Sequence, residues 1–105
     1  MSTKKIQILG SLNKSNVRIA NVDLLAESWQ FDENTGAYYQ EVEIESVTEN
    51  SQVDLTPSIE QLVTFYDKDL GFVTENEGGN VKVWVIGQRP ANDYNIQVTI
   101  TEVQV

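Results

Sequence analysis

Apolar and polar residues alternate along much of the chain, and this pattern predicts β-strands over most of its length. Successive side chains of a strand point to opposite faces, so a strand with one buried face alternates in polarity. Residues 94–103 show this most clearly, since Ile96, Val98 and Ile100 are separated by polar residues. Residues 81–86 are apolar at nearly every position, which is typical of a central strand covered on both faces.

Shorter strands and turns are predicted before and between these two strands. Residues 4–9 alternate in polarity and are followed by a polar loop over residues 10–16. Residues 72–76 form another strand, and the Glu-Gly-Gly-Asn sequence at 77–80 predicts a tight hairpin into the central strand. Residues 32–36 have the composition of a turn, and residues 53–55 are a brief extended piece.

Residues 37–46 predict a half-buried strand with a face rich in carboxylates. The residues on the predicted inward face are Tyr38, Val42 and Ile44, and those on the outward face are Glu41, Glu43 and Glu45.

Residues 17–31 admit two interpretations. Residues 17–21 alternate, which indicates a strand, whereas residues 22–29 fit either a strand or one or two helical turns. An extended conformation places Leu25, Trp29 and Phe31 on one face, with Glu27 as the exception. We therefore favour extended structure here.

One helix is predicted, at about residues 57–69. Pro57 suits the first helical position, Ser58 with Gln61 fits a capping box, and Gly71 is a natural stop. The residues at helical spacing that form its apolar face are Ile59, Leu62, Val63 and Tyr66. The fold class predicted from all these elements is mainly β (α+β): an antiparallel β-sandwich or partly rolled sheet with this one α-helix.

Composition narrows the list of partners. The 105 residues, of which 40% are hydrophobic, fit a single β-rich domain spanning 1–105, with the strand and loop of 1–16 as a candidate assembly arm. Sixteen acidic residues oppose seven scattered basic ones, giving a formal net charge of −9. Nucleic acids and anionic membranes bind clustered Lys and Arg, so we expect neither as a partner.

The residue types present disfavour metal, cofactor and acid–base chemistry. The chain contains no Cys and no His, which are the usual zinc ligands, and His is the commonest general base. Asp32 and Asn34 imitate the start of a calcium-binding loop, with Glu43 at its closing position. However, Gly36 stands where a ligand is needed and Ala37 where the loop needs glycine. We expect no metal, no cofactor and no enzymatic activity.

Carboxylates and aromatic residues remain the candidates for a functional surface. Paired carboxylates catalyse glycoside hydrolysis, but carboxylates two apart on one strand most often form a solvated face, so a small glycosidase or esterase is disfavoured. Tyr39 shares the predicted outward face of Glu41 and Glu43. Together with Trp29, these residues form the candidate binding surface, although core packing is the usual role of aromatic residues in a small β domain.

Several short motifs follow one another in a characteristic order between Trp29 and the last strand. Residues 45–55 contain a strand end, Val-Thr, a polar turn and Val-Asp-Leu, and the predicted helix and hairpin follow. Residues 86–90 then read Ile-Gly-Gln-Arg-Pro before the final Asn-Ile-Gln-Val-Thr-Ile strand at 95–100, and Trp29 precedes a Tyr-Tyr-Gln sequence at 38–40. This order, with Pro90 as its most specific element, resembles small tail-associated β-rich proteins encoded with the tail genes of phages and prophages of Gram-positive bacteria.

This resemblance covers about residues 29–103 and leaves the first 28 residues outside. It implies a virion or tail-associated structural domain, often repeated or oligomeric, and it carries over no catalytic residue. The first hypothesis is therefore a phage or prophage tail-associated structural protein that acts through protein–protein assembly, with other virion or tail proteins or with itself as a homo-oligomer. Residues 4–9 would add a strand to a neighbour's sheet. Without a recognisable signal peptide, we expect it in the virion, or in the bacterial cytoplasm before assembly.

The alternative hypothesis is a carbohydrate-binding module that contacts a host surface glycan. Exposed aromatic side chains, among them Tyr39, would stack on the sugar rings.

Overall fold

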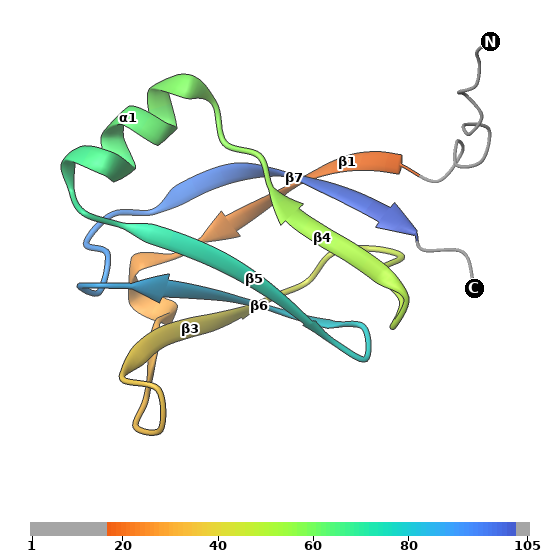
Figure 1. Ribbon diagram of the computed structural model, residues 1–105, viewed down its shortest axis with the longest axis horizontal. Coiled ribbons are helices and arrows are strands. Elements are labelled where there is room, and N and C mark those ends of the chain that lie inside the picture. Colours follow the sequence, from red (N-terminus) through yellow and green to blue (C-terminus); the bar gives the residue numbers. More distant parts are fainter. Residues whose placement is uncertain (1–16, 103–105) are drawn as a thin grey trace, which may run out of the picture.

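The protein folds into two antiparallel β-sheets that face each other, as the computed structural model in Figure 1 shows for residues 17–102, the part of the chain that the structure describes. The strands of the first sheet, in spatial order, are β1 (Val17–Leu24), β7 (Tyr94–Glu102) and β4 (Ser51–Leu55). The strands of the second are β2 (Gln30–Asp32), β3 (Ala37–Val42), β6 (Asn80–Ile86) and β5 (Gly71–Glu77). The predicted mainly β fold with two sheets is thereby confirmed, whereas the predicted strand 4–9 and loop 10–16 lie outside the described residues.

The core lies between the middle strands of the two sheets. β7 is flanked by β1 and β4, and its inward side chains Ile96, Val98 and Ile100 are fully buried. The inward valines of β6, at positions 81, 83 and 85, are also almost completely buried. The alternation along residues 94–103 thus correctly identified the strand at the centre of the first sheet.

The central strand β6 differs from the prediction on one face. It lies between β3 and β5, as predicted, and the turn of Gly78 and Gly79, both with positive φ (61° and 99°), makes the predicted tight hairpin from β5. Its outward face, however, is not covered by a layer of structure, and Ile86 is 57% exposed. The apolar side chain of Ile86 therefore did not indicate that the outward face of β6 is buried.

Residues 17–31 are mainly extended, as favoured, but their faces differ from the prediction. A short 3-10 turn (Ala26–Ser28) separates β1 from β2 and shifts the alternation. Trp29 is consequently buried, whereas Leu25 and Phe31 are exposed. The prediction that these three side chains share one face is wrong.

The strand predicted over 37–46 ends early, at Val42. Beyond it the chain leaves the second sheet and crosses to β4 in the first sheet, with Ser46 in the left-handed region (φ 66°). Glu43 and Ile44 therefore lie in a connection and not on the strand.

The side chain of Gln40 links the two sheets in the interior of the protein. It lies on the inward face of β3 and is only 3% exposed. The amide oxygen accepts a hydrogen bond from the backbone N–H of Leu25 (3.2 Å), and the amide nitrogen donates one to the Leu25 carbonyl (3.1 Å). Gln40 thus takes the place of a strand partner for the residue at which the chain leaves β1.

The helix α1 (Ile59–Asp67) connects β4 of one sheet to β5 of the other, within the predicted range of 57–69. Ser58 caps it and forms the predicted capping box with Gln61, so Pro57 precedes the cap and is not the first helical residue. Neither this helix nor any other in the described part of the chain is long and apolar enough to cross a membrane.

The helix ends at Asp67, four positions before Gly71, which instead begins β5. Asp69 adopts the left-handed conformation (φ 56°) that usually favours glycine. The N–H of Leu70 donates to the carbonyl of Phe65, and that of Asp69 donates to the carbonyl of Tyr66. This pair of bonds is a Schellman motif, so the predicted glycine stop is wrong.

Replacement of Gln40 tests its role as a strand partner. We expect Gln40→Leu to lower the free energy of unfolding by about 1–3 kcal/mol, because it leaves the N–H and carbonyl of Leu25 without a partner in a partly buried site. Urea unfolding measures the loss. The control is Gln52→Leu on the exposed face of β4, with an expected change within about 0.5 kcal/mol. Equal effects at the two positions would contradict this role.

Candidate functional site

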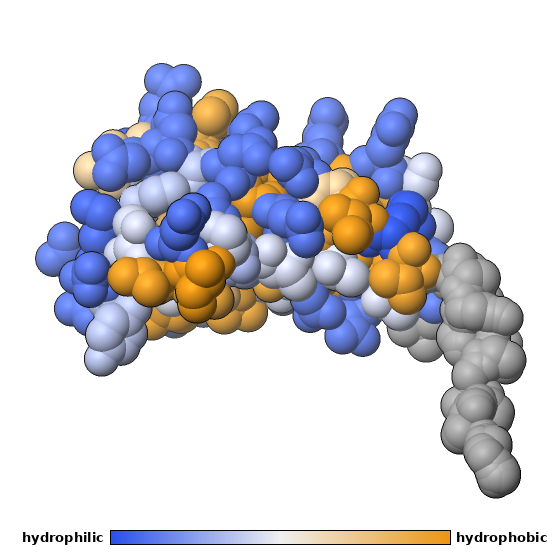
Figure 2. Space-filling model, turned by 90° about the horizontal axis from the view of Figure 1, so that it is seen from above, coloured by the Kyte–Doolittle hydropathy of each residue, from blue (hydrophilic) through white to orange (hydrophobic). Residues whose placement is uncertain are grey.

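The apolar face of α1 points to solvent. Its four residues, which helical spacing predicted to share one face, are exposed by 72% (Ile59), 48% (Leu62), 54% (Val63) and 83% (Tyr66). Seen from above in Figure 2, hydrophobic side chains appear at the end of the molecule that carries α1, between hydrophilic ones. The helical period correctly predicted that these residues share a face, but a period alone does not say whether that face meets the sheets or the solvent.

Phe65, which borders this face, anchors the helix. It is the buried residue of α1, and its ring contacts Phe72 and Tyr94 edge-on, with centroid distances of 4.9 and 5.0 Å. The side chain of Gln61 adds a 2.7 Å hydrogen bond to the backbone carbonyl of Asn95. These contacts fix α1 on the body by one edge, and among residues 17–102 nothing covers the rest of its apolar stripe.

A groove lies between α1 and the body of the protein. Its volume is about 580 Å³. The helix contributes Leu62, Val63 and Tyr66, and the body contributes Leu55, Pro57, Leu70 and Phe72. Concave, mainly apolar surfaces of this kind are where ligands and protein segments bind.

The residues of the candidate binding surface Tyr39, Glu41, Glu43 and Trp29 do not come together. Tyr39 and Glu41 lie on the outward face of the second sheet, as predicted, and Glu43 lies beyond the end of β3. Trp29 is 6% exposed and stacks on Phe72 in the core, with ring centroids 6.1 Å apart. Trp29 is therefore not part of an exposed surface, and packing is its role.

Tyr39 instead forms an aromatic pair with Trp84. The two residues are opposite each other on β3 and β6, and their ring centroids are 5.0 Å apart. The ammonium group of Lys82 lies 5.0 Å from the centre of the Tyr39 ring, and the indole N–H of Trp84 donates a 2.9 Å hydrogen bond to Glu75. The sequence pattern does not give the strand register, so it did not predict that Tyr39 and Trp84 lie opposite each other.

Lys82 is held in its cationic form at this aromatic pair. Its ammonium group lies 3.4 Å from Glu77, and this hydrogen bond is the main reason why the pKa of Lys82 is raised above its ordinary value of 10.5. The cation over the rings stabilises the pair and also covers part of it. A ligand that stacks on Tyr39 would have to displace Lys82.

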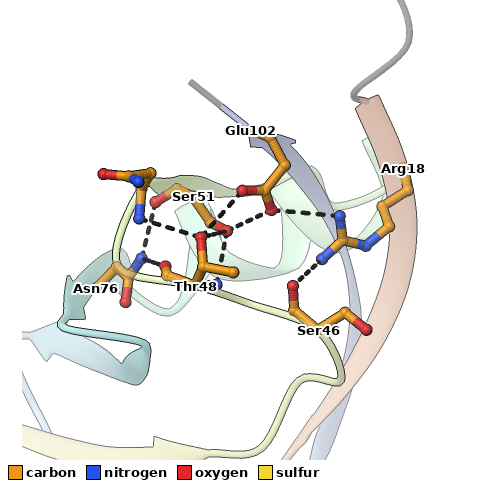
Figure 3. A network of polar contacts seen from close by, with 7 residues as sticks. Arg18, Ser46, Thr48, Ser51, Asn76 and Glu102 are labelled. Carbon is orange, nitrogen blue, oxygen red and sulfur yellow. Dashed lines mark hydrogen bonds and ion pairs between the residues drawn. The ribbon is translucent and has the colours of Figure 1, made fainter. Parts of the chain in front are cut away.

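A cluster of polar side chains lies at the end of the sheets opposite α1 (Figure 3). The carboxylate of Glu102 accepts hydrogen bonds from the hydroxyl groups of Ser51 and Thr48 and lies 3.4 Å from the guanidinium of Arg18. Arg18 also donates to the carbonyl of Ser46. The side-chain amide of Asn76 donates to the carbonyls of Thr48 and Ser51, both at 2.8 Å.

The geometry of this cluster fits a structural role. Ser51 donates its proton to a carboxylate, and the hydrogen bonds from Ser51 first, then from Thr48 and Arg18, lower the pKa of Glu102 below its ordinary value of 4.5. A lowered pKa makes a carboxylate a weaker base, so Glu102 is poorly suited to activate Ser51. The cluster ties the connection between β3 and β4 to strands of both sheets.

Asp32, the first residue of the segment that imitates a calcium loop, also has a structural role. Asp32 accepts hydrogen bonds from the backbone N–H and the hydroxyl group of Thr35, which closes the turn between β2 and β3. Within residues 17–102, no group of three or more Asp or Glu side chains is placed to hold a metal ion.

Comparisons of the chain with models of known protein families, with curated proteins and with solved structures find no match.

Replacement of Glu102 has an effect on stability that depends on pH. A carboxylate whose pKa is lowered by folding stabilises the folded state above its ordinary pKa, and this contribution is lost as the pH falls through the folded-state pKa. We therefore expect Glu102→Gln to lower stability at neutral pH and to lose most of its effect well below pH 4.5. Urea unfolding at both pH values measures this difference. Glu49→Gln, exposed in the same connection, serves as the control. A loss at Glu102 that is the same at both pH values would contradict the assignment.

Proposed function

We propose that this protein is a structural component of a phage or prophage tail and acts through protein–protein assembly, not catalysis. The observation that carries the proposal is the uncovered apolar face of α1 and the groove beside it. The surface of a soluble protein rarely leaves large apolar side chains together on one face unless that face binds a partner.

The exposed face is not needed to hold the helix in place. Phe65, the capping box and the bond from Gln61 to Asn95 already attach α1 to the sheets. The exposed aliphatic residues beside this attachment lower solubility and add little to the core. Their presence is therefore best explained by a partner that covers them.

The tail setting comes from the resemblance of residues 29–103 to tail-associated proteins. A structural role there agrees with the absence of Cys and His from the sequence and with the structural use of the Glu102 cluster and of Asp32. The partner is another tail or virion protein or a second copy of the chain.

A single substitution on the exposed face tests the proposal. We expect Val63→Lys to weaken association by about tenfold or more, because a buried valine contributes about 1.5 kcal/mol or more and a charge placed in the contact adds a penalty. Sedimentation velocity of the full chain, over a range of concentrations, measures this change.

The matched control is Thr64→Lys, the next residue of α1, which is also exposed but lies about 100° around the helix. It introduces the same charge outside the apolar stripe, so we expect it to leave association nearly unchanged. The proposal fails if Val63→Lys and Thr64→Lys have equal effects, or if the wild-type chain neither self-associates nor binds a tail protein.

A second candidate function is glycan binding at the outward face of the second sheet. The specific observation in its favour is the half-exposed pair of Tyr39 and Trp84, with Gln30 and Glu75 as hydrogen-bonding neighbours. Aromatic rings on a flat sheet can stack on sugar rings, and the neighbours can orient the hydroxyl groups.

Glycan binding has a direct test. If the pair binds a sugar, a glycan array probed with the full chain gives hits that Tyr39→Ala removes. Tyr66→Ala, on the exposed face of α1, is the control and leaves the hits unchanged. An array without hits, or hits that survive Tyr39→Ala, would remove this candidate.

A further inference from the structure

The charge of the chain is divided very unevenly between its two parts. All sixteen acidic residues and four of the seven basic ones lie after residue 16, so that part has a formal charge of −12. Residues 1–16 contain Lys4, Lys5 and Lys14 and no acidic residue, which gives them a formal charge of +3. The first sixteen residues are thus electrostatically complementary to the remainder of the chain.

Acidic residues beside the α1 groove make it a suitable partner for the positively charged residues 1–16. The groove itself is lined by apolar side chains, and exposed acidic residues are direct sequence neighbours of its lining residues. These acidic residues are Asp67 and Asp69, which with Lys68 between them separate Tyr66 from Leu70 and give this segment a formal charge of −1. A segment that combines large aliphatic side chains with lysines suits such a groove.

Residues 4–12 have this composition. Ile6, Ile8, Leu9 and Leu12 are aliphatic, and Lys4 and Lys5 lie directly before them. The further inference concerns what occupies the groove. It rests on the proposed assembly function and names the segment that binds there. We propose that residues 4–12 of one copy of this chain bind in the α1 groove of a second copy.

The direction of β1 favours binding between copies. Val17 pairs with Thr101 at the end of the sheet opposite α1, whereas the groove lies near Ile96 and Leu55. β1 runs toward the α1 end, as Figure 1 shows, so a segment entering it would have to reverse its direction to reach the groove of its own chain. Residues 13–16, which link the bound segment to β1, span about 15 Å when extended, so the groove that accepts the segment lies close to the start of β1.

The chain enters β1 at the end of the molecule opposite the groove, so copies arranged head to tail bring the donor segment of each to the groove of the next. Each copy gives its first residues to one neighbour and accepts those of another. Such contacts build rings when the rotation closes and filaments when it does not. Either form is a route to a repeated tail component.

Cysteine cross-linking tests the inference, and the natural chain has no Cys to interfere. Two full-length variants are mixed, one with Ile8→Cys and one with Val63→Cys, and oxidised mildly. We expect a disulfide-linked dimer that contains one chain of each variant. The control replaces Val63→Cys with Thr64→Cys, and here we expect the mixed dimer to be largely lost.

Three results would overturn the inference. The first is a mixed dimer that forms equally well with Thr64→Cys. The second is faster linkage of Val63→Cys to itself than to Ile8→Cys, which would place two α1 helices against each other. The third is the absence of a mixed dimer while a chain carrying both substitutions closes on itself, which would place the segment in its own groove.

Together, the cross-linking and the Val63→Lys experiment distinguish a failure of this inference from a failure of the proposed function. If Val63→Lys abolishes association but Ile8→Cys does not link to Val63→Cys, the groove is an assembly surface with a different occupant. If Val63→Lys leaves association unchanged, the proposed function itself is wrong at this surface.

Discussion

The burial of Phe65 against Phe72 and Tyr94 decides which side of α1 meets solvent. A helix of nine residues is too short to be stable in isolation, so its orientation follows from its tertiary contacts. Phe65 lies at one border of the apolar stripe, and its insertion between the two sheets turns the rest of the stripe outward. The apolar groove and the proposed assembly function depend on this one contact.

The two ends of the sandwich are built in different ways. At the α1 end, aromatic rings fill the space between the sheets and aliphatic side chains remain exposed. At the opposite end, hydrogen bonds around Glu102 hold the connection from β3 to β4 against both sheets. One end of the molecule is therefore polar, with its side chains hydrogen-bonded, and the opposite end is apolar and exposed. The two ends differ, as head-to-tail contacts require.

The sequence was a good guide to elements and a poor guide to the direction of their faces. Alternation identified β7, and glycines identified the hairpin from β5 to β6, because these signals are local. The orientation of α1 depends on Phe65 meeting residues from two distant strands, and the pairing of Tyr39 with Trp84 depends on register. Trp29 entered the core because a 3-10 turn shifted the alternation, and Gln40 was missed because its partner is the backbone of Leu25.

The mass of the wild-type chain in solution, measured by light scattering at increasing concentration, tests self-assembly through α1 most directly. An uncovered apolar helix face that serves assembly predicts a weight-average mass that rises above that of the 11.8 kDa monomer as concentration increases. A mass that stays at the monomer value at every concentration would contradict self-assembly through α1.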